Sequence, residues 1–378
     1  MKTKHAVSKP YLRRLIRESL RAQGYSITNK GIVLNANTKD ALRKTHLLAT
    51  RAEIARAKDT LSPHEDALIN YIANGDEIDP WKIRPYLVAV APDTEYSRLF
   101  RYASLHWSIP ISNGYGRRLR FLIFDENTSK LMGILGLSDP IFSLRVRDEW
   151  IGWNLTQRHQ RLYHVMDAYV LGAVPPYSNL LCGKFVAMIV ASREVREVFH
   201  DRYQGRKTII LQRQRPAELA LVTTTSALGR SSLYNRLKYH NRFVMQSVGY
   251  TAGWGTFHFA NGVYEKMLAF TAEHCEGTAK AAGWGGGEFR NRKEVVRKCL
   301  KALGFPDNWM LHQVKREVFV APLAKNTREY LRGETNRLEY WNDSLDDYFE
   351  FFRERWLLPR AARDLSYKDF HREEWRLW

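Results

Sequence analysis

The sequence has few cysteines and no motif that would bind a metal ion. Its three cysteines, Cys182, Cys275 and Cys299, are isolated from one another, and none lies in a CxxC or CxxH pattern. A zinc site and a disulfide framework are therefore excluded, and this cysteine usage is typical of a reducing cytosol. The twelve histidines show no metal-ligand spacing. We assign no metal to the chain.

Long apolar runs are also missing. The longest one, LLCGKFVAMIVA at 180–191, contains Lys184 and is far shorter than the roughly 20 residues that a membrane helix needs. No apolar segment follows the basic residues of the N-terminus, as it would in a secretory signal. We expect a soluble, cytoplasmic protein without a membrane partner.

Negative charge is scarce outside the C-terminal tail. The chain has 59 Lys and Arg against 40 Asp and Glu, a formal net charge of +19. Residues 334–378 hold 8 basic and 11 acidic side chains, so this tail carries −3 and residues 1–333 carry +22. A basic body favours a polyanionic partner, above all nucleic acid. High solubility is the alternative explanation of the charge.

Apolar periodicity predicts a small helical region at the N-terminus. Residues 10–23 and 38–61 read as basic helices, and a further helix closes on Gly75. The N-terminal helical region is therefore placed at 1–79. The basic side chains of these helices either contact nucleic acid or simply face solvent.

An α/β core follows at 80–262. The segments at 117–126 and 130–137 form a predicted hairpin, and 165–174 and 218–225 read as buried strands. Between these buried strands we expect one long helix that begins at Ser178 or Asn179 and ends near Tyr203. A strand pair is predicted around 243–248 and 255–259. From 263 to 378 the chain returns to helices and ends in an acidic, aromatic tail, so the fold class is α/β with helical flanks.

The stretch TTTSALGRSSLYNRLKY at 223–239 is the main candidate site. Gly229 permits a turn with positive φ, and Ser231 and Ser232 precede a predicted short helix. Amide groups at a helix start carry partial positive charge, so Arg230 and the two hydroxyls would complete a cradle for an anion or a phosphate. Alternatively, Ser231 is only an N-cap and Arg230 pairs with a nearby carboxylate. Asn235 belongs to the same candidate set.

Three other segments could bind a ligand or nucleic acid. PPYSNLLCGK at 175–184 would bring Ser178, Asn179 and Lys184 to the same crevice, although close helix packing explains it as well. NGYGRRLRF at 113–121 offers a stacking ring and cations for phosphates, or merely edge-strand charge. The basic helix at 290–304 would grip a phosphate backbone. The residues assigned in these last two segments are Tyr115, Arg117, Arg118, Arg290, Arg292 and Lys293.

The segment RDEWIGW at 147–153 has two adjacent acids beside two tryptophans. Asp148 is a candidate catalytic acid or base if burial raises its pKa. The alternative is that one acid pairs with Arg147 and that the other, Glu149, faces solvent.

Several long motifs resemble one known family. WSIPISNGYGRRLRFLIFD, TSALGRSSLYNRLKY and EVFVAPLAKNTREYLRGE are similar to segments of the DruA family of the Druantia anti-phage defence system, and the resemblance extends over nearly the whole chain. It implies work on DNA and partnership with other Druantia proteins, including a helicase-type subunit that would supply a motor.

The core also resembles the Mom family of phage DNA-modifying enzymes, whose fold is acetyltransferase-like (GNAT). Arg230 and Tyr234 match the Arg-x-x-x-Tyr turn of that family, and the resemblance implies acetyl-CoA or a similar donor. The sequence departs from the pattern twice. The run Thr223-Thr224-Thr225 replaces the acid that precedes the turn, and GAVPPYSN replaces the Gly-rich donor motif.

These observations leave three functions open. The first is a defence component that binds nucleic acid, preferably DNA, through a basic surface. The second is an acyltransferase-like enzyme that modifies DNA bases, with Tyr234 as proton donor and Arg230 steering the donor. The third is a scaffold without catalytic activity, whose acidic tail docks a helicase partner.

Overall fold

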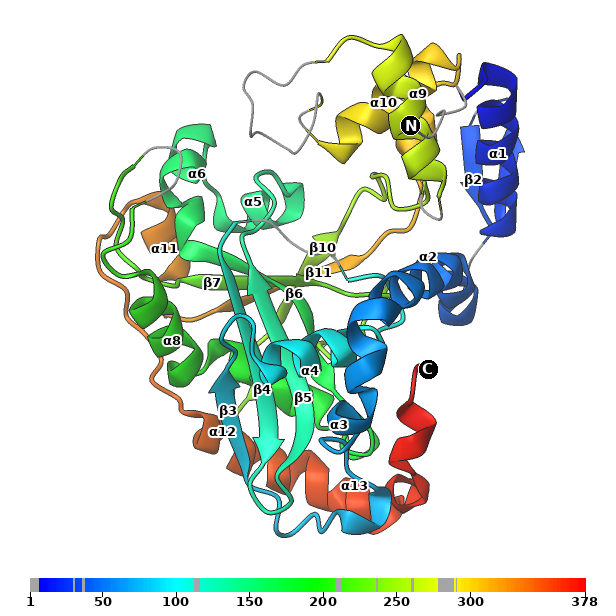
Figure 1. Ribbon diagram of the computed structural model, residues 1–378. Coiled ribbons are helices and arrows are strands. Elements are labelled where there is room, and N and C mark those ends of the chain that lie inside the picture. Colours follow the sequence, from blue (N-terminus) through cyan, green and yellow to red (C-terminus); the bar gives the residue numbers. More distant parts are fainter. Residues whose placement is uncertain are drawn as a thin grey trace.

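A seven-stranded mixed sheet forms the centre of the computed structural model (Figure 1). The structure describes residues 7–29, 31–35, 38–111, 116–207, 212–235, 237–259, 262–277, 289 and 291–378. Across the sheet the strands follow the order β10 (Gln246–Tyr250), β11 (Glu317–Pro322), β7 (Leu221–Thr225), β6 (Val165–Ala173), β5 (Lys130–Ser138), β4 (Arg118–Asp125) and β3 (Pro85–Ala89). The predicted α/β class and the hairpin of β4 and β5 are confirmed.

The one parallel pair of this sheet lies at its centre. Val165–Asp167 of β6 runs parallel to Leu221–Thr223 of β7, and the other neighbouring strands are antiparallel. A parallel pair needs a crossover connection, which α7 (Gly183–Met188) and α8 (Arg193–Tyr203) provide. The prediction of a single long helix was wrong, because Ser192 is extended and its Oγ caps α8.

Both faces of the sheet are covered, which explains why its central strands are apolar at successive positions. Phe121 and Ile123 of β4 pack with α7, α8 and α12 (Leu345–Phe352), whereas Leu122 and Phe124 pack with α3 (Glu65–Ile69) and α4 (Glu95–Ser104). Successive strand residues point to opposite faces, so a strand buried on both sides needs apolar residues throughout.

A second hydrophobic core lies apart from the sheet, at the top of Figure 1. It joins α1 (Lys9–Ala22), β1 (Tyr25–Thr28) and β2 (Gly31–Leu34) to α9 (Val263–His274) and α10 (Arg292–Ala302). We call the described residues of 7–34 and 259–310 the cap. The N-terminal region is therefore not purely helical, since β1 and β2 form a hairpin. The helix α2 (Lys39–Leu61) connects the cap to the sheet.

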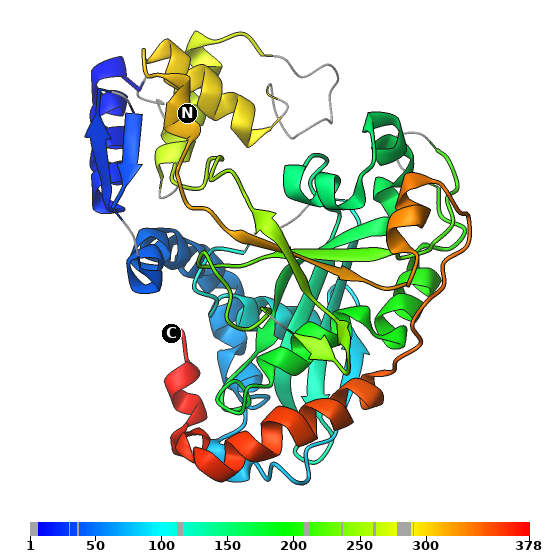
Figure 2. The same cartoon turned by 180° about the vertical axis from the view of Figure 1, so that it is seen from behind.

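The C-terminal tail wraps around the sheet instead of standing free (Figure 2). After α11 (Thr327–Arg332), the helices α12 and α13 (Leu358–Arg363) run along the lower end of the molecule. Trp375 then packs against Tyr102, and Glu65 accepts hydrogen bonds from the Tyr102 hydroxyl at 2.8 Å and the Leu377 amide at 2.7 Å. The tail is therefore part of the core.

Two features differ from the strand prediction near the end of the core. β10 pairs with β11, which comes from the region predicted to be helical, and the residues at 255–259 form no strand. The remaining elements are short: β8 (Lys238–Tyr239), β9 (Arg242–Phe243), α5 (Arg145–Ile151) and α6 (Leu155–Arg161). The predicted capping box of Asn154 and Gln157 is confirmed at α6. None of the helices in the described ranges is both long and apolar enough to span a bilayer.

Candidate functional site

The predicted corner after β7 contains no helix. Residues 226–235 follow bends and a turn. The Ser231 hydroxyl accepts hydrogen bonds from the amides of Leu233 and Tyr234, at 3.2 and 3.1 Å, as an N-cap would. The chain then turns toward β8 instead of continuing a helix, so the expected row of free helical amides is missing from the described part of this corner.

An internal carboxylate already binds this corner. Glu317, a buried residue at the start of β11, accepts from the Ser231 amide at 2.9 Å, and its own amide donates to the Gly229 carbonyl at 3.1 Å. Gly229 has the predicted positive φ, at +73°. Arg230 is exposed and contacts no carboxylate among the residues that the structure describes. The anion cradle stays a prediction, and its central amide is occupied.

Tyr234, the predicted proton donor, lies in apolar surroundings. Its ring packs edge-on against Phe319 with the centroids 5.3 Å apart, and burial raises the pKa of the hydroxyl well above its ordinary value. The neighbouring Ser232 is exposed and Asn235 is partly buried.

The Pro-Pro segment does approach this corner, as predicted. The Lys184 ammonium lies 3.4 Å from the Leu233 carbonyl. The C-terminal tail covers the same place, because Trp356 lies under the Lys184 ammonium and Arg360 donates to the Asn179 carbonyl at 3.0 Å. Ser178 contacts the Asn179 side chain at 3.3 Å. These residues do not fit the pyrophosphate of an acyl-CoA, since tail side chains already occupy the segment where the resemblance would place it.

The two arginines at the start of β4 are held by the fold. Arg117 donates from Nε to Asp139 at 2.8 Å, and its guanidinium stacks on Tyr163 at 4.3 Å. Arg118 is partly buried and its carbonyl accepts from the Tyr203 hydroxyl at 2.9 Å. Tyr115 lies outside the described residues.

The start of α10 stands at the mouth of a cavity. Arg292 stacks on Tyr264 at 3.9 Å and donates to the Phe259 carbonyl, and Lys293 lies 4.2 Å above the ring of Trp254. Arg292, Tyr264 and Trp254 all line the cavity. Arg290 is not among the described residues.

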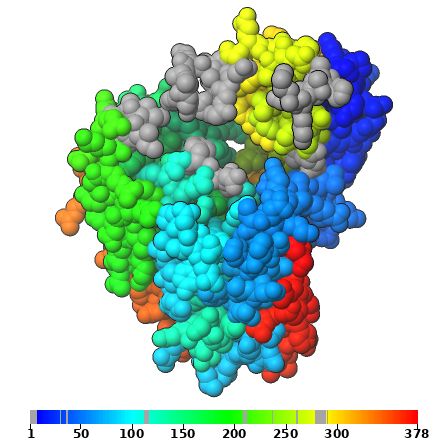
Figure 3. All heavy atoms as spheres, in the orientation of Figure 1, coloured from blue at the N-terminus to red at the C-terminus, as the bar shows by residue number. Residues whose placement is uncertain are grey.

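This cavity separates the cap from the top of the sheet and measures about 560 Å³. Its walls come from α2, the segment before α5, the parallel strands β6 and β7, the start of the cap helices, and the segment that leads into β11. Figure 3 shows the molecule hollowed at this level, between the cap and the segments coloured cyan. The volume lies within the range of roughly 300–1,000 Å³ that is usual for small-molecule sites.

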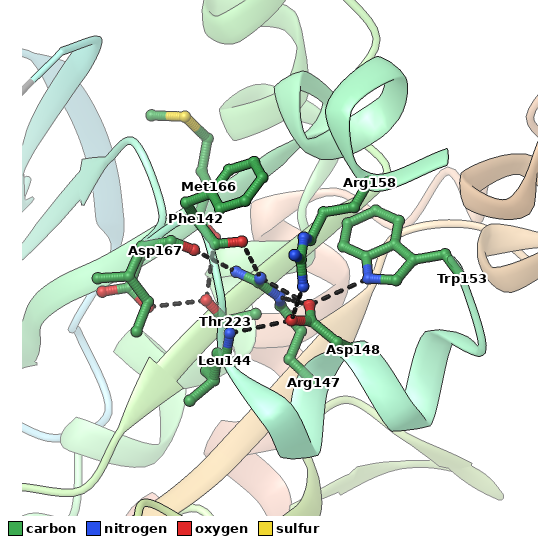
Figure 4. Close-up of polar contacts among 10 residues, drawn as sticks. Phe142, Leu144, Arg147, Asp148, Trp153, Arg158, Met166, Asp167 and Thr223 are labelled. Atoms are coloured by element: carbon green, nitrogen blue, oxygen red, sulfur yellow. Dashed lines mark hydrogen bonds and ion pairs between the residues drawn. The ribbon is translucent and has the colours of Figure 1, made fainter. Parts of the chain in front are cut away.

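Asp167 of β6 lies in the cavity wall, beside β7. The Thr223 hydroxyl of β7 donates to its Oδ1 at 2.7 Å (Figure 4). No residue of the described ranges donates a hydrogen bond to Oδ2. Burial raises the pKa of Asp167 to about 6, and the Thr223 hydrogen bond and the Arg147 charge oppose that rise. Near neutral pH this carboxyl can therefore accept or release a proton.

Asp148, the predicted catalytic acid, is the centre of a saturated polar cluster (Figure 4). Its two oxygens accept from Arg147 at 2.7 Å, Arg158 at 2.9 Å, the Trp153 indole at 3.0 Å and the Leu144 amide at 3.0 Å. Arg147 has no solvent exposure. This geometry favours a structural role, in which Asp148 holds α5 against the sheet, and the catalytic role stays a prediction.

Arg316 is the second unusual group of the cavity. It precedes β11, and its Nε atom is shielded from solvent with no hydrogen-bond partner among the described residues. The aromatic ring of Phe257 lies 5.8 Å from its guanidinium. No carboxylate of the described residues lies within ion-pair distance of it. Within the same described ranges, no group of three or more His, Cys, Asp or Glu could hold a metal ion.

Comparison with known proteins identifies the family. A family model described as "Druantia protein DruA" matches residues 36–333. The chain belongs to the DruA family. A curated DruA from Escherichia coli (strain UMEA 4076-1) is 37% identical over 361 residues, which cover 94% of this chain and 89% of that protein. No solved structure matches the chain. The resemblance read from the sequence motifs is thus confirmed, and membership supports a role in a Druantia system.

Sequence reasoning missed both groups that distinguish the cavity of this DruA-family chain. Asp167 was hidden in the run VMDAYVLGAV, although a single acid in an apolar strand was an available signal. Arg316 offered no such signal, because only the folded chain shows that it lacks a counter-ion.

Proposed function

We propose that this DruA-family chain binds nucleic acid, with DNA as its ligand, as a component of Druantia-type anti-phage defence. The observation that carries the proposal is the gathering of positive charge at one end of the molecule. α1 has five basic residues and one acidic residue, α2 has six and three, and α10 has five and one. α1 and α10 belong to the cap, and α2 runs from the cap toward the sheet (Figures 1 and 2).

Many of these cations are free to meet a phosphate backbone. They are exposed and form no ion pair with any described residue. The set comprises Lys9, Arg21, Lys39, Lys44, Arg51, Lys58, Lys293, Arg297 and Lys301. Lysines and arginines without an internal ion pair can neutralise the phosphates of a polynucleotide. The counterions released in this way are a main source of affinity in such complexes.

A charge-reversal variant of α2 tests this proposal. Lys44, Arg51 and Lys58 are spaced by seven residues, so they lie along one face of the helix. Replacing all three with Glu should weaken DNA binding and reduce the slope of log K against log salt by about 2–3, because each lost phosphate contact removes about 0.9. Fluorescence anisotropy across a salt series measures both quantities.

The matched control carries Glu at Lys325, Arg337 and Lys368, which are exposed on segments outside the cap and α2. It has the same change in net charge and should keep the wild-type slope. Equal losses in the two triple variants would show that only overall charge matters. Absence of DNA binding at low salt would remove the proposal.

A second candidate, an enzyme that modifies a base, is favoured by one observation. The acid that is absent from β7 is supplied across the parallel pair by Asp167, which is hydrogen-bonded to Thr223. An acid placed in a cavity could remove a proton from an amino or hydroxyl group. Mass spectrometry of nucleosides from cells that carry the system, with the wild-type chain or Asp167→Asn, tests this candidate. Identical nucleosides in both would exclude it.

A further inference from the structure

Arg316 places an uncompensated positive charge in the wall of the cavity. The titratable side chains that interact electrostatically with Arg316 are Tyr25, His46 and His312. Burial lowers the pKa of His46 to about 3 and that of His312 to about 4, so both are neutral near pH 7. Burial also raises the pKa of Tyr25, whose hydroxyl donates to the His312 carbonyl at 3.1 Å. None of these groups supplies negative charge.

An arginine is protonated at any physiological pH, and a partly buried arginine charge without an ion-pair partner is costly to the fold. The Arg316 Nε atom has no protein acceptor among the described residues. An anionic ligand that enters the cavity would relieve this cost, and a phosphate matches the planar fork of a guanidinium.

The opposite kind of group lines the same cavity. Asp167 keeps Oδ2 available, and it forms no ion pair with Arg316 although both face the same space. Glu53, Arg56, Glu265 and Arg292 also line the cavity, and its apolar and aromatic part includes Ile141, Phe257 and Trp254. A cavity with arginines, acids and flat aromatic side chains suits a ligand that has a phosphate, a planar ring and a hydrogen-bonding edge.

We propose that the cavity binds a nucleoside phosphate, with the phosphate on Arg316 and the base edge on the Asp167–Thr223 pair. This inference rests on the proposed nucleic-acid binding insofar as the ligand is one nucleotide of a bound strand. A free nucleotide carries the same chemistry, and the experiment below separates the two sources.

Calorimetric titration of the full chain with dAMP, deoxyadenosine and inorganic phosphate tests the site. dAMP should bind more tightly than either fragment. In Arg316→Gln the affinity for dAMP should fall at least about tenfold, the usual effect of losing a charge-assisted hydrogen bond. Arg337→Gln, at an exposed cation outside the cap that does not line the cavity, should change it less than about twofold. Wild-type affinity in Arg316→Gln, or binding of phosphate as tight as dAMP, would overturn the proposal.

Folding controls keep the result interpretable. Because Arg316 has no counter-ion, Arg316→Gln without ligand should unfold at a temperature no lower than the wild type. A strongly destabilised variant would indicate a structural role and would overturn the proposal. Asp167→Asn should retain affinity for inorganic phosphate but lose affinity for dAMP, since it changes only the group that meets the base edge.

Competition with a short single strand identifies the source. If the ligand is a nucleotide of a strand, oligodeoxyadenosine displaces dAMP from the wild type, and Arg316→Gln still binds DNA through the cap with an unchanged salt slope. If the strand does not displace dAMP, the ligand is a free nucleotide. Failure of the α2 charge-reversal test leaves the dAMP titration unaffected, so the two proposals can fail separately.

Discussion

Replacing Asp148 with alanine should lower the free energy of unfolding by about 3–5 kcal/mol, the usual cost of removing one partner from a buried ion pair. Arg147 has no solvent exposure, and Asp148 compensates its charge at 2.7 Å. Arg158 loses its carboxylate partner at 2.9 Å, and the Trp153 indole loses an acceptor at 3.0 Å. The penalty therefore comes mainly from a stranded arginine charge and partly from unsatisfied donors.

Urea unfolding followed by circular dichroism measures this loss. Glu149→Ala is the matched control, because Glu149 is exposed and lies 3.7 Å from Arg145, so its removal should cost no more than about 0.5 kcal/mol. Asp148→Asn should be intermediate, since one oxygen remains as an acceptor. A loss below about 1 kcal/mol in Asp148→Ala would refute the structural role. Loss of an activity at unchanged stability would instead support the catalytic role predicted from the sequence.

Three further changes have defined outcomes. Burial raises the pKa of Asp167 from 3.8 to about 6, so the folded chain holds a proton that the unfolded chain releases, and stability should fall by about 1–3 kcal/mol as pH rises through this interval. Asp167→Asn should not show this loss of stability. The measurement is urea unfolding of the wild type and the variant at the low and high ends of this pH interval, and the same pH dependence in both proteins would refute the argument. Deleting residues 366–378 removes buried Trp375 and should cost at least about 3 kcal/mol; a truncated chain that melts with the wild type would contradict the role of the tail in the core. Glu317→Ala should lower the free energy of unfolding by about 1–3 kcal/mol, because it leaves the Ser231 amide without an acceptor. Arg230→Ala, at an exposed position, should change it by no more than about 0.5 kcal/mol. Equal melting temperatures for the two variants would argue against the contact between Glu317 and Ser231.

The helices and strands that the sequence predicted well are those with a strong local pattern. The hairpin of β4 and β5, strand β6 and helix α1 each combine a sustained apolar pattern with a turn or a stop signal. The failures occurred where distant contacts decided the local structure. The corner at 226–235 has the residues of a helix start, but Glu317 from β11 binds its amide and the chain turns away.

The predicted site residues also fall into two groups, those that lie at the cavity and those that other parts of the chain engage. Arg292 and Lys293 were identified from a basic helix. Arg292 lines the cavity and Lys293 lies over the ring of Trp254. Arg117 and Asn179 are instead engaged by other parts of the chain. The acidic tail looked like a docking element because its charge is local, yet its aromatic residues fill the core beside Tyr102. Composition records charge and hydrophobicity but not the partner that each side chain meets.

By itself the sequence determined the fold class, the basic character of helices α1, α2 and α10, and the family, because periodicity, net charge and long motifs are properties of contiguous residues. Only the tertiary structure decided that Asp167 meets Thr223, that Arg316 has no counter-ion among the described residues, and that both line one cavity. These properties depend on segments far apart in the chain, since the cavity forms where the cap approaches the end of the parallel strands. Burial raised the pKa of Asp167, and the lack of an ion pair among the described residues left the Arg316 charge available for a ligand.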